Sequence, residues 1–86
     1  MTKKSVTINL ETGLDARPVA LLVQRASRHE SSIYIEVGDK RVNAKSIMGM
    51  MSLTLDNGST LTVAADGVDE NEAVVDLEEF LSGVSA

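Results

Sequence analysis

The spacing of apolar residues changes period repeatedly along this 86-residue chain, and this feature constrains its fold most. Residues 6, 8 and 10 are apolar and alternate with polar ones, which is the period-2 pattern of a half-buried strand. From residue 16 the apolar positions follow i, i+3, i+4 and i+7, which is typical of one helix face. Switching between these two periods favours a sheet packed against helices.

A first helix is expected from residue 16 to residue 28 or 29, after a turn at Thr12-Gly13. Asp15 stands at the N-cap position, where short polar side chains are favoured. Pro18 is tolerated because N–H groups of the first turn have no intrahelical partner. The predicted apolar face consists of Val19, Leu22, Val23 and Ala26.

A hairpin and a short helix are expected next. Residues 33–37 alternate again, Gly38-Asp39 forms a tight turn, and residues 40–42 return as the second arm. The apolar stretch 47–53 then predicts one or two helical turns, with Ser46 as N-cap.

The last strand and helix follow a strong turn signal at residues 56–58. Residues 61–65 alternate as a strand, and Gly67 ends it. Acids at 69, 70 and 72 resemble a capping box at a helix start. The apolar face of this helix is expected at Ala73, Leu77, Phe80, Leu81 and Val84.

The expected element order is therefore βαββαβα. Strands interleaved with helices, including one antiparallel hairpin, predict an α+β fold: a four-stranded antiparallel sheet with helices on one face. The other face carries Thr and charged side chains and is expected to meet solvent. We expect a single domain over residues 1–86, without linker or repeat.

Composition excludes several ways of stabilising so small a chain. The absence of cysteine removes disulfides and thiolate metal sites, and a single histidine removes most other zinc chemistry. The acids between residues 66 and 72 lack the spacing of a calcium loop. With 43% apolar and 24% charged residues, the chain can build one core. We expect packing alone to stabilise it, with no metal and no cofactor.

Charge is divided unevenly along the chain. The net charge is −5, yet every Lys and Arg lies within residues 1–45, whereas residues 46–86 hold eight acids and no base. Such an acidic chain is a poor non-specific ligand of nucleic acid, so we expect no direct contact with it. Because no apolar run resembles a signal peptide or a membrane span, we expect no membrane insertion and a cytoplasmic location.

Motifs of the common enzyme classes are absent from the sequence. There is no thiol nucleophile, and His29 has no serine and acid at the spacing of a triad. We expect His29 to be solvated near the end of the first helix. No glycine-rich phosphate loop occurs either. The expectation is a protein that is not itself an enzyme.

Two helix starts stand out as candidate sites. At the first, Gly13, Asp15 and Arg17 surround backbone N–H groups that can hold a phosphate. At the second, a phosphate added to Ser46 would meet similar groups. Ile47 and three methionines follow Ser46, and part of this apolar surface is expected to face a partner.

Each of these features also has a simpler interpretation. Asp15 and Ser46 are ordinary N-cap residues, and methionines often belong to a core. The apolar periodicity therefore predicts an α+β domain and leaves its role open.

Taken together, however, the two segments resemble one known family. Residues 12–20, TGLDARPVA, resemble the active-site segment of HPr, the small phosphocarrier of the bacterial sugar phosphotransferase system. Residues 43–53, NAKSIMGMMSL, resemble the regulatory serine segment of the same family. Length, spacing and element order agree over essentially the whole chain. The resemblance implies an open-faced β-sandwich, similar to the layer expected above.

One residue departs from the family pattern. HPr has a histidine that takes a phosphoryl group from enzyme I and passes it to enzyme IIA proteins, whereas this chain has Asp15. We expect little such transfer, because an N-capping carboxylate is stabilised as an anion and repels an anionic donor. Loss of the histidine with a retained serine is similar to the Crh-like catabolite-repression branch of low-GC Gram-positive bacteria, which typically carries Gln there.

The resemblance implies a regulatory phosphoprotein. Ser46 would be phosphorylated by HPr kinase/phosphorylase, and the phosphoprotein would act as corepressor of catabolite control protein A, a LacI-type repressor. By the same resemblance, Ala16 and Arg17 would neighbour the phosphate. The partner contacts would be Arg17, Ala20, Ile47, Met48 and Met51.

Three alternatives stay open for Asp15. It can be the acceptor, as an acyl phosphate, in a phosphocarrier that still uses enzyme I and enzyme IIA. It can be a fixed anion that partly imitates phosphohistidine. It can also be an engineered replacement of the histidine in an ordinary HPr.

Overall fold

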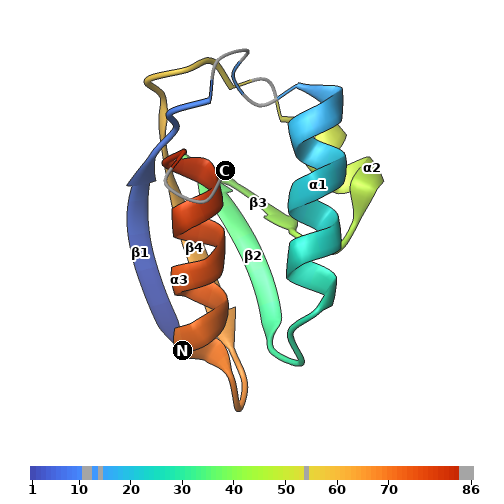
Figure 1. Cartoon of the computed structure of the whole chain (residues 1–86), viewed down its shortest axis with the longest axis vertical. Helices are drawn as coiled ribbons and strands as arrows, with labels where there is room; N and C mark the ends of the chain where they lie inside the picture. Colours follow the sequence, from blue (N-terminus) through green and yellow to red (C-terminus); the bar gives the residue numbers. More distant parts are fainter. Residues whose placement is uncertain (11–12, 14, 54, 84–86) are drawn as a thin grey trace.

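The computed structural model describes residues 1–10, 13, 15–53 and 55–83. Its elements follow the expected order. They are β1 (Thr2–Thr7), α1 (Ala16–Ser27), β2 (Ser32–Val37), β3 (Lys40–Asn43), α2 (Ile47–Met51), β4 (Thr60–Asp66) and α3 (Glu70–Leu81). The strands form one antiparallel sheet in the order β1-β4-β2-β3, and α1 and α3 lie over one face of it (Figure 1). The predicted α+β fold is confirmed.

The strand register explains which face the helices cover. Val6 lies opposite Leu61, and Ile35 lies opposite Val63 on the same side of the sheet, where all four are buried. Because side chains alternate along a strand, this one register buries the apolar set of β1, β2 and β4 together. The sheet residues of the core are Val6, Ile33, Ile35, Leu61, Val63 and Ala65.

The opposite face of the sheet is polar, as expected, with one exception. Glu36 pairs with Lys3 at 3.4 Å, and Arg41 packs over the Tyr34 ring at 3.9 Å from its centroid. Ala64 lies between Lys3 and Tyr34 in the register and is fully buried. We attribute this burial to the long flanking side chains, which cover the small residue.

The predicted helix faces pack onto the core. From α1, Val19, Leu22 and Ala26 are buried. From α3, Ala73, Val74, Leu77 and Leu81 are buried. Val84, predicted to continue this face, lies outside the described residues, as do Thr12 and Leu14 of the segment before α1. Within the described part of the chain, every helix falls short of the length and apolar character that a bilayer crossing requires.

The first strand is shorter than the apolar alternation predicts. Beyond Thr7, Ile8 N–H donates to the Ser59 carbonyl at 2.8 Å, and Asn9 N–H donates to the Leu81 carbonyl at 2.8 Å. Ile8 is nevertheless buried. The apolar alternation therefore continues past the end of β1, because residue 8 is buried where the chain turns from β4 towards the end of α3.

Candidate functional site

Ser46 caps the short helix α2, as predicted. Its backbone is extended, with φ −104° and ψ 113°, and its Oγ accepts the Gly49 N–H at 3.2 Å. Its carbonyl accepts the Met50 N–H at 3.0 Å, which closes the first helical bond. The hydroxyl therefore lies where an acceptor is needed, at the N-terminal end of the helix.

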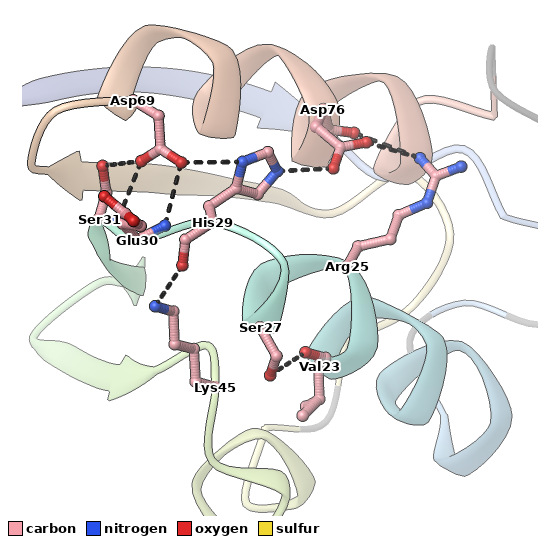
Figure 2. Close-up of polar contacts among 9 residues, drawn as sticks. All are labelled: Val23, Arg25, Ser27, His29, Glu30, Ser31, Lys45, Asp69 and Asp76. Carbon is pink, nitrogen blue, oxygen red and sulfur yellow. Dashed lines mark hydrogen bonds and ion pairs between the residues drawn. The ribbon is translucent and has the colours of Figure 1, made fainter.

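The residues before Ser46 connect it to the end of α1. The Asn43 side chain accepts the Lys45 N–H at 2.8 Å, which tightens the turn between β3 and α2. The Lys45 ammonium donates to the His29 carbonyl at 2.6 Å (Figure 2). The segment that carries Ser46 is thus attached to the loop that leaves α1.

Asp15 occupies the N-cap position of α1, but its carboxylate does not cap the helix. The residue is extended, with φ −101° and ψ −164°, and its side chain makes no capping hydrogen bond. Its carbonyl accepts the Val19 N–H at 2.9 Å. The expectation that backbone N–H groups stabilise this carboxylate is therefore wrong. The side chain is exposed, as are those of Ala16 and Arg17.

Gly13 packs closely where the chain enters α1. Its φ is +71°, a region that glycine adopts readily, and its N–H donates to the Leu10 carbonyl at 2.9 Å. A Cβ on this residue would lie 2.8 Å from the Leu55 carbonyl oxygen and 3.0 Å from Asp56 Cα. Gly13 therefore packs against the backbone of residues 55 and 56 with no room for a side chain, two positions before the N-cap residue of α1.

The methionine cluster divides between the core and the surface. Met50 is fully buried, whereas Met48 is 82% exposed and Ile47 and Met51 are about half exposed. This division follows from the helix, since only one side of five residues can face the core. Part of the cluster is therefore exposed, and that this part faces a partner stays a prediction.

Helix α1, which lies beside α2 (Figure 1), adds a further large apolar side chain to the surface. Leu21 is about half exposed, and it lies one helical turn from exposed Arg17. Sequence reasoning missed Leu21; the available signal was a large apolar residue outside the predicted buried stripe. We define the α1–α2 surface as Arg17, Ala20, Leu21, Ile47, Met48 and Met51.

The structure contradicts the expectation that His29 is solvated. Its side chain is only 15% exposed, because the loop after α1 crosses against α3. Nε2 lies 2.8 Å from Asp76 Oδ2, and Nδ1 lies 3.4 Å from Asp69 Oδ2 (Figure 2). The ring sits between two carboxylates that sequence spacing gives no reason to pair with it.

Asp69 was expected in the capping box of α3, but its side chain makes no capping hydrogen bond. It accepts the Ser31 hydroxyl, the Ser31 N–H at 2.9 Å and the Glu30 N–H at 3.0 Å. The Ser31 hydroxyl is the main cause that holds the pKa of Asp69 well below its usual range; the two N–H groups and His29 add to it, against partial desolvation. Asp69 therefore joins the start of α3 to the loop before β2.

The described residues contain no candidate metal site. No group of three or more His, Cys, Asp or Glu side chains is arranged there to hold an ion. The candidate site therefore consists of the Ser46 hydroxyl, the exposed Asp15 carboxylate and the α1–α2 surface.

Comparison with known proteins gives this arrangement a family. Residues 2–83 match the family described as "PTS HPr component phosphorylation site". Over 81 residues the chain is 53% identical to the HPr-like protein Crh of Halalkalibacterium halodurans, covering 94% of this chain and 96% of that protein. It is 47% identical to the HPr-like protein Crh of Bacillus subtilis, covering 94% and 95%.

Solved structures of HPr and Crh proteins have the same fold as this chain. The HPr of Bacillus anthracis superimposes with a TM-score of 0.90 at 46% identity, over 93% of this chain and 95% of that one. A crystal structure of Bacillus subtilis Crh, described as a swapped dimer, gives 0.77 at 46% identity, over 96% and 95%. The matched family consists of phosphocarrier and regulatory proteins that are not catalytic and that interact with kinases and phosphotransferase-system proteins. The chain belongs to the HPr family, and the two relatives compared above are HPr-like Crh proteins.

Proposed function

We propose that this protein is a cytoplasmic regulatory phosphoprotein, a single domain switched by phosphorylation of Ser46. One observation carries the proposal: the Ser46 hydroxyl begins α2 and is followed directly by the exposed side chains of Ile47, Met48 and Met51. A phosphate at that hydroxyl would lie beside apolar surface that is already exposed. Charge and apolar contact would together form one epitope.

The electrostatics of α2 favour this modification. A phosphoserine carries about −1.5 to −2 charges at neutral pH and three strong acceptor oxygens. The Gly49 N–H already donates to Ser46 Oγ, so a phosphate oxygen can take over this bond. Phosphorylation at this position adds charge without removing the acceptor that the helix start requires.

The proposed partners are those that the resemblance to the HPr family implies. HPr kinase/phosphorylase would phosphorylate Ser46, and catabolite control protein A, a LacI-type repressor, would bind the phosphoprotein as corepressor. A basic pocket on the repressor would receive the phosphate, and the α1–α2 surface would supply the apolar contact. Arg17, on the exposed side of α1, would contact the repressor or the phosphate.

The test is titration of the repressor with phosphorylated and unphosphorylated protein. We expect phosphorylation to tighten binding at least about tenfold, since hydrogen bonds to charged groups contribute on the order of 1.5–3 kcal/mol. Met48→Ala in the phosphoprotein should weaken binding. Val75→Ala is the matched control, because Val75 is a half-exposed apolar residue of α3. Equal affinity with and without phosphate would contradict the proposal.

A second candidate function has an observation in its favour. The Asp15 carboxylate is exposed and makes no capping hydrogen bond, so an oxygen is available to attack phosphorus. The product would be an acyl phosphate: a carboxylate O–P bond forms while the P–N bond of the enzyme I phosphohistidine breaks, and its imidazole leaves. Hydroxylamine-labile label after incubation with enzyme I and phosphoenolpyruvate would support this phosphocarrier, and absence of label would exclude it.

A further inference from the structure

Two exposed methionines lie on α2, shortly after Ser46 and at the edge of the molecule (Figure 1). The chain has four methionines and no cysteine, so thioethers are its only sulfur groups. Met48 is 82% exposed and Met51 is 51% exposed, whereas Met50 is fully buried. Because an oxidant in solution has to reach the sulfur atom, this short helix carries both accessible and protected thioethers.

The helix places the two accessible thioethers on one side. Residues three positions apart on a helix are neighbours on its surface, so Met48 and Met51 share a face of α2. Met50 instead belongs to the hydrophobic core. Ser46 Oγ accepts the Gly49 N–H at 3.2 Å, so the hydroxyl and both accessible thioethers belong to the same short stretch of helix. A change at either sulfur therefore alters the surface next to the proposed phosphate.

We propose that Met48 and Met51 form a reversible oxidation site, at which a peroxide converts the thioethers to sulfoxides and removes apolar surface beside Ser46. A sulfur lone pair attacks one peroxide oxygen, and the S–O bond forms as the O–O bond breaks. The second oxygen takes the proton of the first and leaves as water. Methionine sulfoxide reductases reverse the change: a dithiol is oxidised to a disulfide, and the sulfoxide oxygen leaves as water. The effect on a partner rests on the proposed function, whereas the oxidation itself does not.

The division of the methionines between core and surface confines the change to the surface. A sulfoxide is polar, so at Met50 it would place a polar group without a partner in the core. At Met48 and Met51 the sulfoxide oxygen can stay in contact with water. The oxidised protein therefore stays folded, while the exposed side of α2 becomes less apolar. Oxidation would oppose the effect of the Ser46 phosphate without removing the phosphate.

Peptide mass mapping after graded treatment of the folded protein with hydrogen peroxide tests the site. We expect sulfoxide first at Met48, then at Met51, and at Met50 only when the protein is unfolded in urea. Methionine sulfoxide reductases A and B with a dithiol should return both surface residues to their original mass. The urea midpoint of the protein oxidised at these two residues should stay close to that of the untreated protein. Equal reaction at Met50, or an unreactive Met48, would overturn the proposal.

Titration of the repressor with protein phosphorylated on Ser46 tests the consequence. Peroxide treatment should weaken binding at least about tenfold, because a sulfoxide cannot supply the apolar burial of a thioether.

The control is the double variant Met48→Leu and Met51→Leu, which keeps Met1 and Met50 but has no oxidisable group on the exposed side of α2. Whatever its own affinity, that affinity should be the same before and after peroxide. A wild type that peroxide leaves unaffected, or a variant as sensitive as the wild type, would overturn the proposal. If phosphorylation alone does not tighten binding, the proposed function fails, and the mass map still decides the oxidation site.

Discussion

The starts of α1 and α2 look alike in sequence and differ in structure. Each has a short polar residue at the N-cap position, Asp15 in one case and Ser46 in the other. The serine accepts a helix N–H, whereas the aspartate does not, and α1 begins instead where Gly13 packs against the backbone at residues 55 and 56. A residue type that is suited to capping thus indicates where a helix begins but not what holds its first turn.

The largest expected difference between the two starts is in phosphorylation. Ser46→Ala should abolish labelling by HPr kinase/phosphorylase and ATP, because the proposed acceptor oxygen is gone. Asp15→Ala, the matched change at the other helix start, should leave the label intact. Intact-mass measurement of both variants checks this. Label on Ser46→Ala would place the acceptor at another residue.

Backbone packing at the first start is tested by Gly13→Ala. The added Cβ would lie 2.8 Å from the Leu55 oxygen at a φ of +71°, so we expect a loss of unfolding free energy of about 2 kcal/mol or more. Gly49→Ala is the control in α2, where the same atom meets ordinary contacts of 3.5 Å and longer. That variant should be neutral or slightly stabilised in urea unfolding. Equal losses would disprove the special role of Gly13.

Substitutions of Ser46 and Asp15 should also differ in the free energy of unfolding, by less than the effect expected at Gly13. Ser46→Ala removes a cap and should cost about 1 kcal/mol, whereas Asp15→Ala should change stability by less than about 0.5 kcal/mol. Both values come from urea unfolding at neutral pH. A cost at Asp15 as large as that at Ser46 would mean that its carboxylate caps α1 in solution.

The start of α3 extends the comparison to acid pH. Hydrogen bonds lower the pKa of Asp69 in the folded state. The carboxylate therefore contributes its full stabilisation above the ordinary carboxyl pKa of about 4. That contribution is lost as the pH falls below this value. The wild type should therefore lose stability more steeply than Asp69→Asn during acid titration. Identical slopes would show that these hydrogen bonds do not distinguish folded from unfolded protein.

The fold was largely predictable because periodicity reports burial directly. The strand faces around Val6 and Ile35 and the helix faces around Leu22 and Leu77 needed no knowledge of partners. Ser46 was predictable for a related reason, since its cap involves a residue three positions along the chain.

Long-range polar contacts were not predictable. Asp69 accepts from residues 30 and 31, and His29 meets carboxylates 40 or more positions away, so no local pattern reports them. Leu21 was missed for a different reason: its exposure is visible only once the buried side of α1 is known. Local capping and burial can be derived from sequence, whereas contacts that tertiary packing creates require the fold.

The most direct test of a regulatory protein phosphorylated on Ser46 is the intact mass of the wild type after two parallel incubations. One contains HPr kinase/phosphorylase and ATP, and the other contains enzyme I and phosphoenolpyruvate. We predict one added phosphate in the first, mapping to Ser46, and none in the second. Phosphate on Asp15 in the second incubation, with none on Ser46 in the first, would contradict a regulatory phosphoprotein and identify a phosphocarrier.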